Sequence, residues 1–478
     1  MNDKVNSERR APWRRPKVWV PLVLMMFVIG SIACYYVSSR SEVEAELAAI
    51  KKRGFPTSPL ELDSWYKRVP AESNAALALQ EAYFLHVDAP ATNHPNEIGK
   101  ELKIGEPLSA ELRASVENHL KNNAETLEQI RVAAQLKEGR FPVDLTTGFS
   151  ALLPHLAQMK RMAILMKWQV IYQSAEGNRE KALRGLEEGF AIAGVLEEEP
   201  LFISALVRIA MTALMMPAME RLVTEHTMTE PELRRLEAIV ERAIEGGRKS
   251  MLRGMAGERA MGLSAFEMSG RAFSQLGGGG APAGAQDIAM NLLFDVRRAI
   301  GMHNRDRMFY LERMGESEAA FSKDYPEMFQ AGQDVTERME AGIKGHRFRY
   351  IISGMLLPAL SKGAQKEALL AAQLRCARAA LAIERFRLKN GRLPEIQDLV
   401  PEYLQEWPSD TVDGEPIEYE KLAKGYIVMS RGATELKNKG KKTNFTDVAF
   451  TVLRCAVEAP TGTTARGAAG GEGQANPR

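Results

Sequence analysis

The sequence predicts a mainly α-helical protein with an N-terminal transmembrane helix, an irregular α-solenoid or helical bundle, and a small C-terminal α+β module. Three observations support this fold class. The stretch from Val18 to Val37 contains no charged residue. Apolar side chains recur every three or four positions through most of the chain, which is typical of helices. Segments that read as strands occur only after residue 415.

The composition of the 478-residue chain is that of a folded protein with more than one core. A chain of this length exceeds the size at which one hydrophobic core usually stays undivided. Hydrophobic residues make up 45% and charged residues 26%, which argues against disorder through most of the length. The formal net charge is only +2 and the basic residues form no stripe, so nucleic acid is not an expected partner.

The uncharged stretch from Val18 to Val37 is predicted to cross a lipid bilayer. A helix of this length is about 30 Å long, which matches the hydrocarbon core of a membrane. Residues 1–17 carry six lysines and arginines, whereas residues 38–53 carry four. By the positive-inside rule, we expect a single pass through the cytoplasmic membrane, with the N-terminus in the cytoplasm and most of the chain on the extracytoplasmic side.

Two alternatives to this helical anchor stay open. A cleaved signal peptide would use the same apolar stretch, but its length and the lack of an A-x-A site favour retention. Residues 31–34 end in Cys34 and resemble the lipobox of bacterial lipoproteins, although Ser31 stands where leucine is usual. A lipid anchor would leave most of the chain on the same side of the membrane.

Helical segments are predicted to fill most of the chain between residues 41 and 389. Ser41 and Glu44 have the spacing of a capping box, which predicts a short helix that ends at Gly54. Prolines then mark a stalk that reaches Pro70. Further helices are predicted over residues 75–86, 109–137, 287–314, 334–360 and 365–389.

Two pairs of neighbouring helices are predicted in the middle of the chain. Residues 152–174 and 179–196 flank a tight polar turn and look like a helix hairpin of the tetratricopeptide (TPR) kind. A second pair is predicted over residues 201–223 and 229–244. No consensus recurs at a fixed period, so we predict an irregular α-solenoid or bundle and not a counted repeat.

Residues 201–219 form a second apolar stretch, in which only Arg208 is charged. Arginine at the centre of a membrane helix costs about 2.5 to 3.5 kcal/mol on insertion scales, so a buried helix of the folded body is the favoured interpretation. A buried arginine needs a carboxylate partner. Glu187, Glu197 and Glu258 are the candidates.

The chain changes character after residue 390. A short helical or turn segment is predicted over residues 399–404, and an antiparallel sheet is predicted from strands over 416–421, 425–431 and 447–454. The predicted domains are a cytoplasmic tail (1–17), a transmembrane helix (18–37), a stalk (38–70), a TPR-like helical domain (71–276), a Gly-rich linker (277–286), a helical continuation (287–364), a C-terminal module (365–454) and a disordered tail (455–478).

The C-terminal module resembles the globular part of the major pseudopilin of type II secretion systems. The resemblance rests on residues 390–394 (NGRLP), 403–404 (YL), 407–410 (WPSD), 413–416 (DGEP), Tyr419 and 425–432 (GYIVMSRG). It implies a long helix followed by a small sheet. Pseudopilins also have a processed N-terminal helix, which begins at phenylalanine with a glutamate at its fifth position, and a calcium-binding acidic loop. This chain lacks that N-terminal pattern, and residues 433–439 offer one carboxylate and two lysines, so the calcium site is not implied.

The whole chain is similar to an uncharacterised bacterial family of membrane-anchored helical proteins that end in this pseudopilin-like module. The resemblance is carried by residues 62–66, 69–70, 74–76, 140–144, 153–156, 199–200 and 206–210. It implies the architecture, and no activity attaches to the family.

No catalytic, cofactor or metal site is predicted. The seven histidines never pair at metal-ligand spacing, and the H-E-x-x-H, C-x-x-C and G-x-S-x-G motifs are absent. Ser64 and Lys67 match the S-x-x-K pattern of penicillin-binding enzymes, but the S-D-N and K-T-G elements are missing. Cys376 and Cys455 either form a disulfide or remain buried thiols, and the second state is favoured.

Two functional hypotheses follow. The first is a non-enzymatic, membrane-tethered extracytoplasmic scaffold or binding protein of unknown ligand, associated with an envelope or secretion assembly. The second is an envelope hydrolase whose site is assembled from scattered residues such as His155, Glu258 and Asp144. A deep pocket that joins such residues would favour the enzyme, and a shallow groove would favour the scaffold. The acidic run at residues 197–199 is expected to be a solvated helix end.

Overall fold

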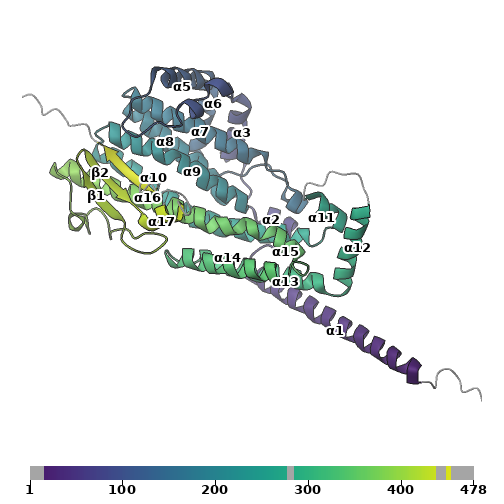
Figure 1. The fold of residues 1–478 in the computed structure, drawn as a ribbon. Coiled ribbons are helices and arrows are strands. Elements are labelled where there is room, and N and C mark those ends of the chain that lie inside the picture. The colour runs from purple at the N-terminus through teal and green to yellow at the C-terminus, as the bar shows by residue number, and fades with distance from the viewer. Residues whose placement is uncertain (1–15, 277–284, 438–447, 454–478) are drawn as a thin grey trace, which may run out of the picture.

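A computed structural model describes residues 16–276, 285–437 and 448–453 of the chain. Helices make up most of this part, and three strands form one small antiparallel sheet near its C-terminal end. Figure 1 shows the helices packed into an elongated body, from which α1 projects alone. The predicted fold class is confirmed.

The elements follow one another in this order. The α-helices are α1 (Pro16–Lys52), α2 (Pro59–Trp65), α3 (Ala75–Leu85), α4 (Pro95–Ile98), α5 (Ala110–Asn122), α6 (Ala124–Gln135), α7 (Pro154–Ala175), α8 (Arg179–Gly194), α9 (Phe202–Glu225), α10 (Glu230–Ala265), α11 (Gly270–Leu276), α12 (Ala285–Ala299), α13 (Met302–Phe321), α14 (Glu327–Gly345), α15 (Ile351–Leu356), α16 (Pro358–Asn390) and α17 (Arg431–Lys437). The strands are β1 (Glu418–Leu422), β2 (Gly425–Met429) and β3 (Ala449–Leu453), and short 3₁₀ helices include η4 (Leu145–Ser150), η5 (Val195–Glu198) and η6 (Ile396–Asp398).

Helix α1 joins the apolar stretch to the folded body without a break. The prediction of a separate short helix that starts with a capping box at Ser41 is wrong. No proline or glycine lies between residues 31 and 53 to end a helix. Arg40 and Glu44 also form an ion pair of 2.7 Å one turn apart, which supports continuous helix. The helix ends before Gly54, whose φ of +84° suits glycine.

The predicted helix over residues 109–137 is divided at Asn123 into α5 and α6. The Asn123 side chain accepts a hydrogen bond from the Val87 backbone N–H and donates one to the Val87 carbonyl, both at 2.9 Å. It also donates to the carbonyl of His119 at 2.9 Å. These contacts to a distant segment hold the break, so local periodicity could not reveal it.

Helices α7 and α8 form the predicted hairpin, and α9 and α10 the predicted second pair. Helices α7, α8 and α9 pack on one another, and α9 and α10 both contact α16. Helix α9 lies inside this body and Arg208 is buried, as predicted. Helix α10 continues to Ala265, well beyond the predicted end at residue 244, because apolar side chains keep the helical spacing through its glycines.

The later helices are also divided differently from the prediction. The segment predicted as one helix over residues 287–314 breaks at Gly301, which has a φ of +77°. The segment predicted over residues 334–360 contains the end of α14, all of α15 and the start of α16. Helix α16 therefore begins at Pro358, earlier than expected, and ends before Gly391, whose φ of +68° provides a left-handed C-cap.

The sheet has the order β1-β2-β3 with antiparallel pairing, as predicted. Tyr419 pairs with Val428, and Val428 pairs with Phe450. The short segment expected over residues 399–404 is a run of turns that follows η6. The sheet packs on α16 and β3 also contacts α9, so the C-terminal module shares its core with the helical body.

Several predicted segments lie wholly or partly outside the described residues. These are most of the N-terminal tail (1–17), most of the Gly-rich linker (277–286), and the C-terminal tail (455–478), which includes Cys455. Residues 285 and 286 of the predicted linker open α12. Cys376 is buried, and burial raises the pKa of its thiol.

Candidate functional site

One cavity of the described body has a volume of about 420 Å³, which is within the range of small-molecule sites. It lies between the segment that follows α1, helix α2, and the outer faces of α10 and α13. We call it the basic cavity. Its lining residues are Arg53, Phe55, Trp65, Lys249, Leu252, Arg253, Gly315, Glu318, Ala319 and Ser322.

The N-terminal wall of the basic cavity is held by two helix termini. Gly54 ends α1 and places Arg53 and Phe55 on either side of the turn. Ser58 then caps α2 by accepting a hydrogen bond from the Glu61 N–H. This short helix ends at Trp65, whose ring centroid lies 6.2 Å from that of Phe55.

The other walls of the basic cavity are one face each of α10 and α13. On α10, Lys249, Leu252 and Arg253 lie three and four residues apart, and therefore share one face. Gly315, Glu318, Ala319 and Ser322 share a face of α13, which continues into Ser322 at its C-terminal cap. Two basic side chains thus face one acidic side chain across the cavity.

Carboxylates of η5 hold the two cations of α10. Glu198 binds Lys249 at 2.6 Å and Arg253 at 2.8 Å. Glu197 lies 3.3 Å from Lys249. The hydrogen bond with Glu198 raises the pKa of Lys249, so this side chain is charged at neutral pH.

Arg53 has only a distant ion-pair partner, whereas the partner of Glu318 is a buried arginine. Arg53 lies 3.8 Å from Glu46, which is too long for a hydrogen bond, and about half of its side chain is exposed. Glu318 is paired with the buried Arg259. Burial raises the pKa of Glu318, although Arg259 and Arg53 partly offset this effect. Arg53 is therefore the cation that an incoming anion would recruit at the lowest cost.

Two aromatic rings, tilted by 55° relative to each other, contribute apolar surface to the basic cavity. The Arg253 guanidinium carbon lies 4.9 Å from the Trp65 ring centroid, and that of Arg259 lies 5.5 Å from the Phe55 centroid. These distances are those of cation–π contacts. The arrangement suits a ligand that has an anionic group and an apolar or aromatic part.

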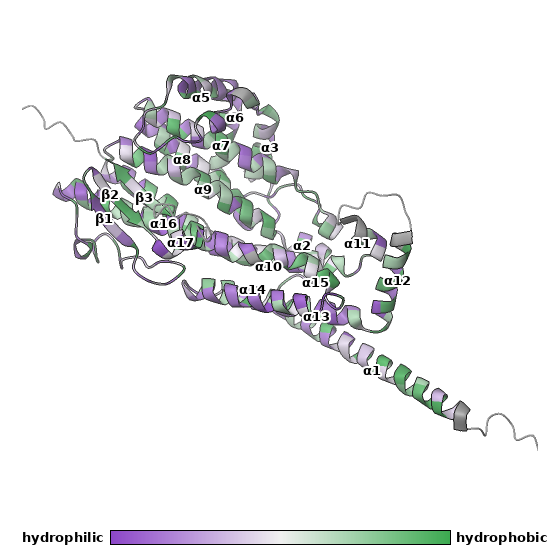
Figure 2. Cartoon of the chain, viewed as in Figure 1, coloured by the Kyte–Doolittle hydropathy of each residue, from purple (hydrophilic) through white to green (hydrophobic). Residues whose placement is uncertain are grey.

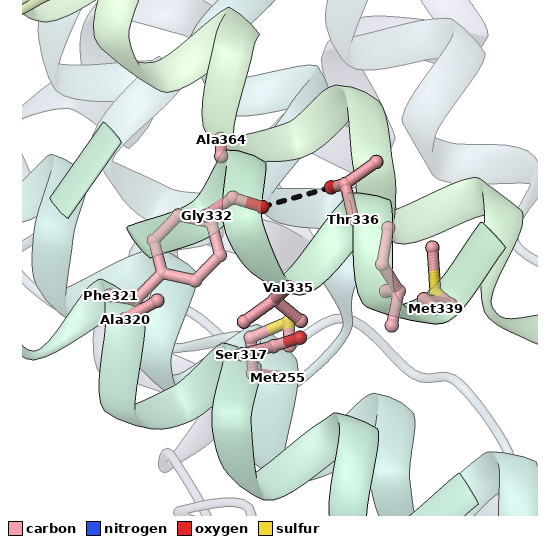
Figure 3. Close-up of a pocket in the computed structure, with 10 residues that line it drawn as sticks. Met255, Ser317, Ala320, Phe321, Gly332, Val335, Thr336, Met339 and Ala364 are labelled. Atoms are coloured by element: carbon pink, nitrogen blue, oxygen red, sulfur yellow. Dashed lines mark hydrogen bonds between the residues drawn. The ribbon is translucent and has the colours of Figure 1, made fainter. Parts of the chain in front are cut away.

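A second pocket lies between α10, α13, α14 and α16 (Figure 3). Its volume is only about 20 Å³, and apolar side chains such as Met255, Phe321 and Val335 line most of it. The Thr336 hydroxyl donates to the Gly332 carbonyl at 2.9 Å, so it is already satisfied. This pocket is a packing gap without recognition groups.

The three residues of the hydrolase hypothesis have separate surroundings. Asp144 caps η4 by accepting a hydrogen bond from the Thr146 N–H at 3.0 Å. His155 is buried on α7, and Glu258 lies on α10, where burial raises its pKa to about 7. No hydrogen bond or ion pair between any two of them is found in the described residues.

His155 instead belongs to a closed polar cluster. Its Nε2 lies 2.9 Å from a Glu199 oxygen, and the Ser204 hydroxyl donates to the same carboxylate at 2.6 Å. The ring of Phe141 stacks on His155. Because Ser204 donates to Glu199 and not to His155, the cluster lacks the nucleophile–base contact of a catalytic triad. Glu199 is 1% exposed, so the expectation that residues 197–199 form a solvated helix end is wrong for this residue.

Other residues that carried the family resemblance meet beside this cluster. Asn74 and Arg140 exchange two hydrogen bonds of 2.9 Å between the Asn74 side chain and the Arg140 backbone. The Arg140 guanidinium pairs with Asp63 and lies 4.5 Å from the Tyr66 ring centroid. These contacts join the stalk region to α3 and to the segment before α7, which is a structural role.

Arg208 lies between Glu197 and Glu367 in the body. Of the three predicted partners, Glu197 is near Arg208, whereas Glu187 pairs with Arg235. Glu258 is not among the groups that act on the pKa of Arg208. Glu367, on α16, is the carboxylate that the sequence reading missed. The only sign of this partner in the sequence was that a glutamate stands among the regularly spaced apolar residues of α16.

The S-x-x-K match has no catalytic geometry. The Ser64 hydroxyl donates to the Leu60 carbonyl at 3.1 Å, while Lys67 pairs with Glu138. Trp65, between them, is the residue that lines the basic cavity. None of the cavity residues was predicted as a site from the sequence, because four separate segments supply them.

Within the described residues, no group of three or more histidine, cysteine, aspartate or glutamate side chains is placed to hold a metal ion. Comparisons with models of protein families, with curated proteins and with solved structures find no match. The function must therefore be inferred from the geometry of the chain itself.

Proposed function

We propose that this chain is a membrane-tethered extracytoplasmic binding protein whose basic cavity takes a small anionic ligand with an apolar or aromatic part. The observation that carries the proposal is the combination, in one cavity of about 420 Å³, of Arg53, Lys249 and Arg253 with the rings of Phe55 and Trp65. Cavities of this size with a few converging charges are typical of ligand sites.

The placement outside the cytoplasm rests on α1. This helix is long and apolar enough to cross a membrane, and none of its apolar window is buried against the body. The charge difference across the apolar stretch favours a cytoplasmic N-terminus. The basic cavity follows the end of α1, about 20 Å along the helix from the end of the apolar stretch.

The C-terminal module supports a role in an envelope or secretion assembly. Its resemblance to pseudopilins suggests a partner of that class, and the TPR-like hairpin of α7 and α8 offers further binding surface. In this proposal the helical body is a scaffold that places the cavity and the module at the membrane surface.

The binding proposal can be tested with the full chain in lipid nanodiscs. The probes are 1-naphthyl phosphate, which has a charge and a flat apolar group, and 1-naphthol, which lacks the charge. Isothermal titration should show binding of the phosphate that is at least tenfold tighter. Arg53→Gln should weaken it about tenfold, since a charged hydrogen bond contributes roughly 1.5 kcal/mol.

The matched control is Arg234→Gln on α10. Arg234 is also an exposed arginine in an ion pair, with Glu230 at 2.9 Å, but it is not among the cavity residues. This variant should bind like the unaltered chain. Equal affinity for both probes, or no effect of Arg53→Gln, would contradict the proposal.

A further inference from the structure

Helix α12 presents an apolar face to the outside of the body. Its fully buried side chain, Phe294, packs against Phe273 of α11 with ring centroids 5.2 Å apart. On the opposite side, Ile288, Leu292 and Val296 lie four residues apart and are 73%, 63% and 48% exposed. Leu293 continues this face. Such a contiguous apolar stripe normally faces a core, a partner or a membrane.

The end of α12 lies beside the end of the apolar part of α1. Helix α12 leads into Gly301, and a Cβ atom placed on Gly301 would lie 3.1 Å from the Tyr36 Cα and 3.2 Å from a ring atom of Tyr35. Tyr35 and Tyr36 are near the C-terminal end of the uncharged stretch, where tyrosines commonly mark the membrane–water interface. Figure 1 shows α12 running across the direction in which α1 leaves the body.

An exposed aromatic ring lies close to α12 as well. Phe348, in the turn between α14 and α15, is 83% exposed. Its carbonyl accepts a hydrogen bond from Arg297 of α12. The neighbouring Arg349 lies 3.5 Å from the Tyr35 hydroxyl, and Arg347 is exposed beside them. Apolar side chains with arginines close by are the composition of surfaces that bind lipid headgroups and the upper acyl region.

From this geometry we infer that the outer face of α12, together with Phe348, docks on the surface of the bilayer that α1 crosses. The inference rests on the proposed membrane anchoring by α1. Docking would give the body two attachments to the membrane, α1 through it and α12 on it. Because α13 runs from Gly301 beside α1 toward Glu318, this contact would fix the orientation of the basic cavity relative to the bilayer.

Nitroxide labels on the full chain in anionic lipid nanodiscs test the inference. Cys34 and Cys455 are replaced by serine, the buried Cys376 is kept, and single cysteines are introduced as Leu292→Cys, Ile29→Cys or Leu152→Cys. Continuous-wave electron paramagnetic resonance then compares collisions of each label with oxygen and with a water-soluble nickel complex. Oxygen is concentrated in lipid and the nickel complex in water.

The label at residue 292 is expected to collide more with oxygen than with nickel, as the label at residue 29 in α1 should. The label at Leu152, an exposed side chain of the body, should show the reverse. A water-exposed label at 292 with a lipid-exposed label at 29 would overturn the docking and leave the anchor intact. A water-exposed label at 29 would overturn the anchor itself.

The experiment also distinguishes the case in which another protein surface, and not the bilayer, covers the outer face of α12. If a second copy of the chain covers it, the label at 292 would be protected from both reagents and its spectrum would broaden through spin–spin contact. This outcome would also overturn the docking. Val296→Cys repeats the test at a second site on the face, in case the label at 292 disturbs the helix.

Discussion

Helices α1 and α9 are both long and apolar enough to cross a membrane, yet they lie in different surroundings. In α9, 61% of the most apolar window is buried inside the body, whereas none of the corresponding window of α1 is. Figure 2 shows the apolar half of α1 projecting alone, while α9 lies among other helices. Apolar length alone therefore does not decide which of the two is a membrane anchor.

What separates them is the ionisable groups that α9 carries. Arg208 lies between Glu197 and Glu367, and Glu220 accepts a hydrogen bond from the Thr451 N–H of β3. Each group has acidic or hydrogen-bonding neighbours that only the folded body supplies. Helix α1 has no charge between Val18 and Val37, so it needs no such partner. The comparison predicts different consequences for charge changes in the two helices.

The largest expected effect is on the buried charges of α9. Glu367→Ala would remove the carboxylate that acts most strongly on the buried Arg208 and leave Glu197 as the other acidic group near it. A buried charge that loses its compensation costs up to about 3 to 5 kcal/mol. The melting temperature of the chain in detergent, followed by circular dichroism, should fall strongly. Glu337→Ala, at an exposed glutamate of α14, is the control and should change it little.

The double variant Arg208→Leu and Glu367→Leu sharpens this prediction. It removes both buried, oppositely charged groups at once, and replacement of such groups by apolar residues is often nearly neutral. It also removes the one charge from the apolar stretch of α9 over residues 201–219, which then resembles the uncharged stretch of α1. The double variant should have a clearly higher melting temperature than Glu367→Ala and keep α9 in the body. Equal melting temperatures of the two variants would show that Arg208 does not depend on Glu367.

A somewhat smaller effect is expected when a charge is placed in α1. Val28→Arg puts arginine near the centre of the apolar stretch, at a cost of about 2.5 to 3.5 kcal/mol for insertion. More of the chain should be released from membranes by an alkaline carbonate wash. Ser41→Arg lies beyond the stretch on the exposed side of α1 and should leave retention unchanged. Full retention of Val28→Arg would argue against α1 as the anchor.

The smallest effect concerns Glu220 and pH. Burial raises the pKa of Glu220 to about 7, from an ordinary value of 4.5. The folded state therefore binds this proton more tightly than the unfolded state. The stabilising contribution is complete below pH 4.5 and is lost as the pH rises through about 7. Glu258 has a pKa raised to about 7 by burial as well, and contributes with the same sign.

Glu220→Gln keeps an oxygen that can accept the bond from Thr451 but removes the titration. It should stabilise the chain at pH 8 by on the order of 2 kcal/mol and have little effect at pH 4. Thermal melts at the two pH values give this difference. A variant that is equally stabilised at both would show that the carboxyl of Glu220 does not titrate as the structure indicates.

The sequence revealed those elements whose signals are local. The turn at residues 175–178 predicted the α7 and α8 hairpin, and the strand-like segments after residue 415 predicted the sheet. The continuity of α1 was missed because Ser41 and Glu44 mimic a capping box within a helix. The break at Asn123 was missed because its side chain is held by Val87, a contact that local periodicity does not encode.

The candidate site was much harder to predict than the fold. The need for a carboxylate near Arg208 followed from the cost of an unpaired buried charge, and Glu197 was among the candidates. Glu367 is far from Arg208 in sequence, and only the packing of α16 on α9 brings them close. The basic cavity joins Arg53, Trp65, Lys249 and Glu318 from four segments, and the S-x-x-K match around Trp65 did not indicate it.

The central proposal is that α1 alone crosses the membrane and that the body, with α9 inside it, lies on the extracytoplasmic side. Labelling of single cysteines with a membrane-impermeant maleimide in bacterial spheroplasts tests it most directly, in the background that lacks Cys34 and Cys455. Leu152→Cys, in the body, should react in intact spheroplasts, and Ser7→Cys, before α1, should react only after permeabilisation. Reaction of Leu152→Cys only after permeabilisation would contradict the account.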